Sequence, residues 1–171
     1  SEILQVQQPS LLNDKQEYEV LGTDISCNLG STNIPNLMKS PDFGKSVETM
    51  VRALTYVTDH SSIDAVPTIK NGNDQAHTIG LGGMGLHTMF ATNQMHYGSP
   101  ESIEFTDIYF MLLNYYTLAA SNKIAKERGE AFVNFNKSSY YTGEYFDAYT
   151  DSDVVFQSEK VKHIFEGIKV P

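Results

Sequence analysis

Two residues in the first part of this chain have side chains that could do chemistry. Cys27 is the single cysteine and lies in the run Asp-Ile-Ser-Cys-Asn-Leu-Gly-Ser that begins at Asp24. Glu2 places a carboxylate at the start of the sequence. A thiol can react as a thiolate, and a carboxylate can act as a general base. Taken alone, however, a lone cysteine is more often a small buried hydrophobic residue, and a terminal glutamate is more often a solvated surface group.

The composition describes a globular chain that could form one domain. Of its 171 residues, 40% are hydrophobic and 19% are charged, which is ordinary for a folded protein. The net charge is −9 and the twelve Lys and Arg residues are scattered, which argues against binding to nucleic-acid phosphates. No apolar run approaches the roughly 20 residues of a membrane-spanning helix, and no signal segment opens the chain. We therefore expect a cytoplasmic protein that binds neither nucleic acid nor membrane.

The sequence offers no pattern for a metal site. A single cysteine excludes an internal disulfide and a cysteine-rich zinc site. The five histidines show neither His-x-x-His nor Glu-x-x-His spacing. We expect this chain to bind no metal and no cofactor of its own.

Capping residues and hydrophobic periodicity predict helices between short strands. A strand with a close backbone approach at Gly30 is expected over residues 25–34, and Pro35 is expected to end it. Ser40 as N-cap and Pro41 in the first turn predict the start of a helix. Its buried face is expected to contain Phe43, Val47, Met50, Val51, Leu54 and Val57. This mixture of elements indicates an α/β layer arrangement.

The rest of the chain is less regular. A second, longer helix is predicted from the Ser99-Pro100 start signal to Gly129, and a short one over residues 158–166. Residues 11–22 are polar and are expected to form a surface connection. The glycine-rich segment 71–93 is ambiguous, and residues 132–149 are aromatic-rich and irregular.

Residues 80–85 read Gly-Leu-Gly-Gly-Met-Gly, which matches the pattern of a dinucleotide-binding loop. That loop requires a hydrophobic strand before it and an acidic residue closing the next strand. Here the preceding residues 74–78 are polar, and Glu101 and Glu104 fall in a helix start. We therefore interpret the glycines as close packing between a strand and the following helix.

The motifs together resemble the catalytic region of the large (α) subunit of ribonucleotide reductase, most closely the class Ib type. The resemblance rests on the run that starts Ser-Glu-Ile-Leu-Gln-Val and on the run around Cys27. It extends over residues 40–45, 79–82, 86–87 and 124–130 and so covers essentially the whole chain. The resemblance implies that residues 1–171 are one segment of a ten-stranded α/β barrel, incomplete here and without an internal domain boundary.

The resemblance also implies roles for Glu2 and Cys27. In this family a cysteine thiyl radical abstracts the 3′-hydrogen of a ribonucleotide, and the 2′-hydroxyl then leaves as water. Glu2 matches the glutamate that deprotonates the 3′-hydroxyl as general base. Cys27 matches one of two cysteines that reduce C2′ and close to a disulfide. We expect both side chains to point into one cavity, with Cys27 on a buried strand.

Further components follow from the resemblance. The complete enzyme is expected to need the remaining segments of the large subunit and a small subunit with a dimetal-tyrosyl radical. It should also need a glutaredoxin- or thioredoxin-like dithiol reductant and a ribonucleotide substrate. The radical cysteine is expected directly before Ser1, so that end is expected to be a junction made by a split gene, an intein or cleavage. The isolated chain is expected to be inactive and poorly stable.

Two alternatives remain open at the level of sequence. The radical source could be adenosylcobalamin, because the active-site motifs of the classes overlap. The chain could also be an inactive fragment with a structural or interaction role. The paired tyrosines at 115–116 and 140–141 invite comparison with the family's radical-relay tyrosines, but we assign them a packing role.

Overall fold

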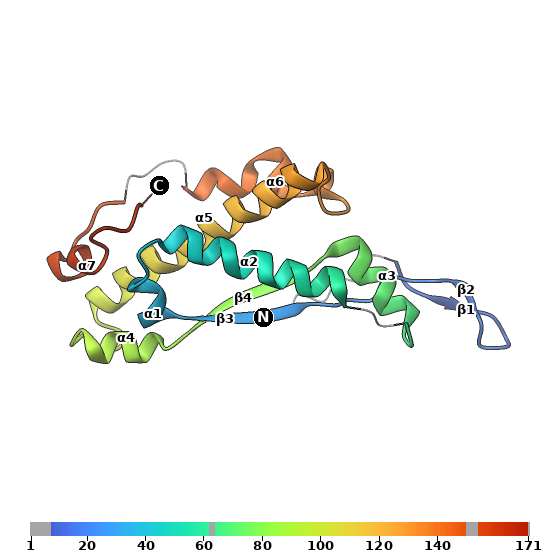
Figure 1. The fold of residues 1–171 in the computed structure, drawn as a ribbon, viewed down its shortest axis with the longest axis horizontal. Coiled ribbons are helices and arrows are strands. Elements are labelled where there is room, and N and C mark those ends of the chain that lie inside the picture. The colour runs from blue at the N-terminus through green and yellow to red at the C-terminus, as the bar shows by residue number, and fades with distance from the viewer. Residues whose placement is uncertain (1–7, 62–63, 150–153, 171) are drawn as a thin grey trace.

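A computed structural model describes residues 8–61, 64–149 and 154–170. The molecule is elongated, with two long helices lying along a pair of strands and a β-hairpin extending at one end (Figure 1). In the described part of the chain, no helix combines the length and the apolar character needed to cross a membrane. The expectation of a mixed α/β fold is confirmed.

The central strands are β3 (Asn28–Asn33) and β4 (Ile79–Met84), which pair in parallel from Asn28 opposite Ile79 to Asn33 opposite Met84. Parallel neighbours require a crossover connection. The crossover consists of α1 (Ile34–Met38), α2 (Phe43–His60) and α3 (Pro67–Ala76). Two strands and their connecting helices thus form one β-α-β layer unit.

The strand predicted over residues 25–34 is shorter in the structure, and Pro35 has a different role from the one expected. Pro35 lies in the first turn of α1 and so begins a helix directly after β3. Asn33 caps this helix, because its Oδ1 accepts a hydrogen bond from the backbone N–H of Asn36 at 3.0 Å.

Helix α2 begins two residues later than the sequence suggests. The N-cap is Asp42 and not Ser40, since Asp42 Oδ1 accepts a hydrogen bond from Lys45 N at 2.8 Å. The buried face is as predicted at Phe43, Val47, Val51 and Leu54, but Met50 is only half-buried, Val57 is 48% exposed and Thr58 is fully buried. At this end the helix faces Asn28, the polar first residue of β3. The Thr58 hydroxyl accepts a hydrogen bond from the Asn28 side chain, which a valine could not do.

The ambiguous segment contains three elements: α3, β4 and α4 (Leu86–Thr92). The second long helix, α5 (Pro100–Arg128), is confirmed, with Ser99 as N-cap and Gly129 in the left-handed conformation at its end (φ 72°). The short closing helix is confirmed as α7 (Glu159–Ile164), capped by Ser158.

Two segments have more structure than expected. Residues 11–22, expected to be a surface connection, form an antiparallel hairpin of β1 (Leu11–Leu12) and β2 (Tyr18–Val20). The aromatic-rich region forms short turns of helix: η1 (Phe135–Lys137), α6 (Ser139–Thr142) and η2 (Glu144–Tyr149). Tyr140 and Tyr145 contact each other there, with ring centroids 4.5 Å apart, in agreement with a packing role for Tyr140.

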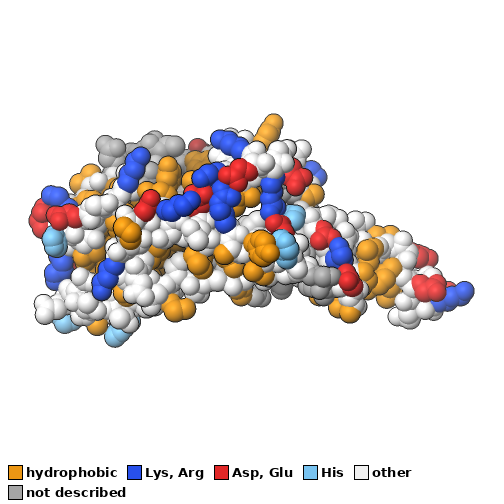
Figure 2. Space-filling view, in the orientation of Figure 1, with side chains coloured by type: hydrophobic (Ala, Val, Ile, Leu, Met, Phe, Trp, Pro, Cys, Tyr) orange, Lys and Arg blue, Asp and Glu red, His pale blue; other side chains and the backbone are white. Residues whose placement is uncertain are grey.

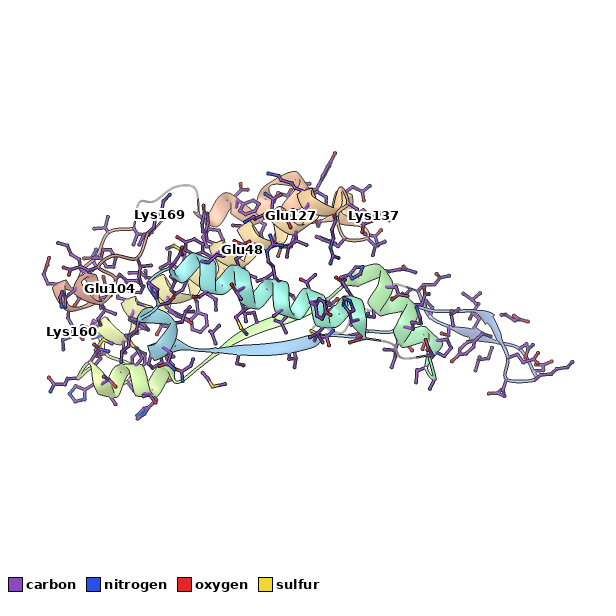
Figure 3. All side chains as sticks on the ribbon, viewed as in Figure 1. Glu48, Glu104, Glu127, Lys137, Lys160 and Lys169 are labelled. Carbon is purple, nitrogen blue, oxygen red and sulfur yellow. The ribbon has the colours of Figure 1, made fainter. Side chains whose placement is uncertain are left out.

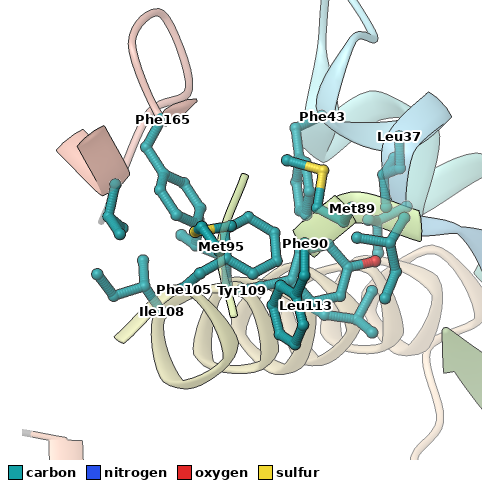
Figure 4. Close-up of a cluster of buried hydrophobic side chains, with 14 of the residues drawn as sticks. Leu37, Phe43, Met89, Phe90, Met95, Phe105, Ile108, Tyr109, Leu113 and Phe165 are labelled. Atoms are coloured by element: carbon teal, nitrogen blue, oxygen red, sulfur yellow. The ribbon is translucent and has the colours of Figure 1, made fainter. Parts of the chain in front are cut away.

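The hydrophobic core is built around α5 and includes residues of α1, α2, α4 and α7, with side chains of β4 packed against it (Figure 4). Tyr109 and Phe105 of α5 are fully buried and stack at a centroid distance of 5.9 Å. Val47 and Val51 of α2 pack into the same cluster. The core therefore fixes α2 and α5 on one side of the sheet.

Ion pairs also join α2 to α5. Glu48 on α2 accepts hydrogen bonds from Arg52 Nε and Lys123 Nζ, each at 2.8 Å, and Arg52 reaches Glu127 at 2.7 Å. Figure 3 shows Glu48 and Glu127 on these adjoining helices, and Figure 2 shows acidic and basic side chains side by side on this face. The hydrogen bonds from Lys123 and then Arg52 lower the pKa of Glu48 to about 2.

We predict that Glu48→Gln reduces stability at neutral pH and that this difference disappears in acid. Because the pKa of Glu48 is lowered in the folded protein, its contribution is complete above the ordinary value of 4.5 and is lost as pH falls toward about 2. Urea unfolding midpoints of both proteins across this range test the prediction. Glu130→Gln, at an exposed carboxylate, is the control. A constant difference between the Glu48 variant and the parent at all pH values would contradict it.

Candidate functional site

Cys27 lies one residue before β3 and is half-buried. The expectation of a buried strand position is therefore wrong in detail, because the ladder with β4 begins only at Asn28. The thiol lies against β4, since a Cβ atom added to Gly80 would be 3.6 Å from Cys27 Sγ. The cysteine thus lies directly before the first residue pair of the parallel ladder.

The two faces of the β3–β4 sheet differ completely. On β3, the side chains of Asn28 and Thr32 point to the helices, where they hydrogen-bond Thr58 Oγ1 and Tyr109 OH. Side chains alternate along a strand, so Leu29 and Ser31 point the other way. Leu29 is 63% exposed. We call the side that bears Cys27, Leu29, Ser31, Gly80, Gly82 and Met84 the open face.

Glycines keep the open face flat. A Cβ at Gly80 would lie 2.6 Å from Leu29 Cδ2, a distance that real Cβ atoms do not show. At Gly82 the nearest side-chain atom would be Ser31 Oγ at 3.5 Å. The absence of a side chain at Gly80 therefore makes room for Leu29 of the neighbouring strand, and the exposed Gly82 leaves the β4 backbone accessible two residues further on.

The same glycines decide against a dinucleotide-binding loop. Residues 80–84 lie within strand β4, not in a turn between a strand and a helix. On the helix side, a Cβ at Gly83 would be 3.2 Å from Ile34 Cδ1 at the start of α1. The sequence predicted close packing against the following helix, α4, but the close contact of Gly83 is with α1. Gly85 alone lies at a helix start, with φ 83°, as N-cap of the short helix α4.

The backbone on either side of Cys27 is held by α3 and by Thr78, the residue directly before β4. Asp24 N donates to Thr68 O at 3.1 Å, and Asn28 N donates to Thr78 O at 3.2 Å. Gly72 of α3 packs directly on the backbone of Asp24, because an added Cβ would lie 1.8 Å from Asp24 O. Backbone contacts on both sides thus fix where Cys27 lies.

Glu2 lies outside the residues that the structure describes, so its place relative to Cys27 is untested. Its shared cavity with Cys27 stays a prediction. Sequence reasoning missed Leu29, Gly80 and Gly82 as parts of the same face as Cys27. Strand alternation within residues 27–31 could have indicated Leu29, but the two glycines required knowledge of the pairing of β3 with β4.

Other features of the described residues offer no competing site. No group of three or more His, Cys, Asp and Glu side chains among them could hold a metal ion. One cleft of about 970 Å³ lies between the first turns of α5 and residues 154–158, and a second of about 500 Å³ lies between the start of α2 and α5. Neither is lined by Cys27, so the open face remains the candidate site.

Comparison with known proteins shows which family has this arrangement. Residues 1–169 match the family described as ribonucleotide reductase, barrel domain. The chain is 42% identical over 171 residues to ribonucleoside-diphosphate reductase subunit alpha of Bacillus subtilis, covering 100% of this chain and 24% of the relative. It is 40% identical over 174 residues to the subunit of that name in Mycoplasma pneumoniae, covering 99% and 24%.

A related protein of Bacillus phage SPbeta, named ribonucleoside-diphosphate reductase nrdEB subunit alpha, is 40% identical over the full chain, which covers 16% of its length. The chain thus spans a quarter or less of the length of these curated relatives. The family match nevertheless covers residues 1–169, which include Cys27 and every helix and strand that the structure describes. The chain therefore belongs to the ribonucleotide reductase family, as a segment of the large-subunit barrel domain.

Proposed function

We propose that this chain is a catalytic segment of a class Ib ribonucleoside-diphosphate reductase and forms part of its ten-stranded barrel. The observation that carries the proposal is the position of Cys27. Its thiol lies beside Gly80 of β4, on the side of the parallel strand pair that faces away from α2 and α5. In a closed barrel this side of the sheet faces the interior, where a substrate can be kept from water.

The proposed reaction balances as follows. Cys27 and a second cysteine outside this chain give up two electrons and two protons and form a disulfide. The ribonucleotide accepts them, its C2′–OH bond is replaced by a C2′–H bond, and the hydroxyl leaves as water. An external dithiol then reduces the disulfide by thiol–disulfide exchange. Cys27 is the residue of this chain that changes its covalent state.

Glu2 is the proposed general base. A carboxylate that takes the proton of the 3′-hydroxyl makes loss of water from the neighbouring carbon easier once the 3′ radical exists. Glu2 and Cys27 are 25 positions apart, and the segment between them includes the β1–β2 hairpin, which turns the chain back before β3. Such a return allows both residues to serve one ribose.

The proposal includes components that this chain does not contain. A thiyl radical cysteine and the partner of Cys27 come from the rest of the large subunit. A small subunit with a dimetal-tyrosyl radical generates the thiyl radical, and a glutaredoxin- or thioredoxin-like protein supplies electrons. Dependence of turnover on such a small subunit, and not on adenosylcobalamin, is expected of the complete enzyme.

We predict that Glu2→Gln lowers kcat for ribonucleotide reduction by about 100-fold or more, because general-base catalysis contributes at least that factor and an amide cannot accept the proton. The measurement is steady-state turnover of the complete enzyme with the small subunit and a dithiol. Glu19→Gln, an exposed carboxylate of the hairpin, is the matched control and should keep the parent rate. A Glu2→Gln enzyme of near-parent rate would remove Glu2 from the mechanism.

A further inference from the structure

We infer that Asn28 and Thr58 are positioning residues for the Cys27 thiol, and that Asn73 holds Thr58 in place by a hydrogen bond to its backbone carbonyl. The inference rests on the proposed redox role of Cys27. It concerns how the helix layer determines the place and direction of a thiol on the opposite side of the sheet. None of the three residues touches the open face.

The first contact joins strand to helix. Asn28 Nδ2 donates a hydrogen bond of 2.8 Å to Thr58 Oγ1 on α2. The Thr58 hydroxyl in turn donates to Leu54 O at 3.1 Å, so its own proton is engaged and a lone pair is left for Asn28. Thr58 is fully buried, which makes this acceptor costly to leave without a partner.

The second contact joins α2 to α3. Asn73 Nδ2 donates to Thr58 O at 2.9 Å, and Asn73 is 2% exposed. Asn73 follows Gly72, the residue on which the backbone of Asp24 rests. The helix residues that hold Thr58 thus also hold the segment leading into Cys27, and the cysteine lies between two points of attachment.

Alternation of side chains along the strand links these contacts to the direction of the Cys27 side chain. Because the side chain of Asn28 is held in the helix layer, the neighbouring side chains of Cys27 and Leu29 must point to the open face. A slip of one residue would reverse this. Cys27 itself precedes the ladder, and Asn28 at the first rung is the residue of the ladder next to it in the chain.

Position matters for this thiol because a disulfide forms only within narrow limits of Cα separation and torsion angle. A thiol that samples both directions at the end of a strand meets its partner in the right geometry for a smaller fraction of the time. The expected cost falls on the rate of C2′ reduction and on the disulfide equilibrium. Substrate binding, which other parts of the barrel provide, should change little.

The test uses the complete enzyme with Thr58→Val, which removes the hydroxyl at nearly constant shape, and Thr58→Ser, which retains it. We expect Thr58→Val to lower kcat about 10- to 100-fold, the range for misplacement of a reacting group, with KM within about 2-fold. Thr58→Ser should restore most of the rate. Asn28→Leu should match Thr58→Val, and the double variant should be no slower than either single one, because both remove one interaction.

A second readout separates positioning from general destabilisation. In a dithiothreitol redox buffer, we expect the equilibrium constant for disulfide formation at Cys27 to fall about 10-fold in Thr58→Val, which corresponds to about 30 mV. Thr55→Val is the control. Its hydroxyl bonds only within the helix in the contact the structure shows, to Val51 O at 2.8 Å, and its loss should leave the rate and the equilibrium unchanged.

Any one of three results would overturn the inference. These are parent-like kcat and disulfide equilibrium in Thr58→Val, a loss in Thr55→Val as large as that in Thr58→Val, and a loss of that size in Thr58→Ser. The proposed function is judged separately with Cys27→Ser in the same assay. If that variant still turns over, the redox role itself fails. If it is inactive while Thr58→Val is normal, only the positioning role fails.

Discussion

Cys27→Ser is expected to abolish repeated turnover of ribonucleotides by the complete enzyme with a dithiol reductant. Serine is nearly the same size as cysteine, so the half-buried site beside Gly80 should fold as before. A hydroxyl, however, cannot form a disulfide or supply electrons to C2′. We expect a loss of at least about 1000-fold in kcat, the scale for removal of a group that forms a covalent bond in the reaction.

The measurement is deoxyribonucleotide formed per active site over many turnovers. Ser121→Ala, on the exposed side of α5, is the control for small changes in hydroxyl content and should turn over normally. Mass spectrometry of tryptic peptides should find Cys27 in a disulfide after turnover of the parent enzyme without reductant. Sustained turnover by Cys27→Ser would exclude a redox role for this thiol.

Gly72→Ala is expected to destabilise the folded protein severely, although the substitution ordinarily helps a helix. In an exposed helix interior, replacing Gly by Ala stabilises by about 1 kcal/mol. At Gly72 the new Cβ would lie 1.8 Å from Asp24 O and 3.2 Å from Asp24 N. Both are backbone atoms, so α3 or the segment before Cys27 must move. We expect a net loss of about 3 kcal/mol or more, the upper range for overpacking a core.

Chemical unfolding of the complete enzyme, with the soluble yield as a second measure, tests the expectation. Gln75→Ala, on the exposed side of the same helix, is the matched control and should change stability by less than about 0.5 kcal/mol. Because displacement of Asp24 also displaces Cys27, kcat of any folded Gly72→Ala enzyme should fall. A variant as stable and as active as the parent would show that α3 does not rest on this segment.

Some elements could be predicted from the sequence because their signals are local. Helix α5 starts at a Ser-Pro pair and ends at Gly129, and each of these residues acts within one turn of its own helix. Ser158 likewise predicts α7, since its side chain accepts from Val161 N. A helix start is harder to predict where two suitable N-cap residues lie close together. Ser40 and Asp42 are both suitable, and the structure has Asp42 as the N-cap, while the Ser40 hydroxyl forms a hydrogen bond with Ser46 Oγ at 2.8 Å.

Other features depended on contacts that no local pattern contains. Val57 continues the apolar spacing of α2, yet Thr58 is the buried residue, because the helix ends over Asn28 and Asn73. The hairpin β1–β2 was missed because its two strands are only two and three residues long. Such short strands carry too little alternation to be recognised.

The resemblance of the segments around Glu2 and Cys27 to family motifs could be recognised from the amino-acid order, because a motif is a pattern along one chain. Where the side chain of Cys27 points depends on the folded protein. Its direction follows from the parallel pairing of β3 with β4, from Gly80 of β4 beside the thiol, and from the hydrogen bond that the neighbouring Asn28 donates to Thr58 on α2. These partners lie some 30 to 55 positions away along the chain. Side-chain direction on a strand is set by register and by what covers each face, and both arise only when distant segments pack together.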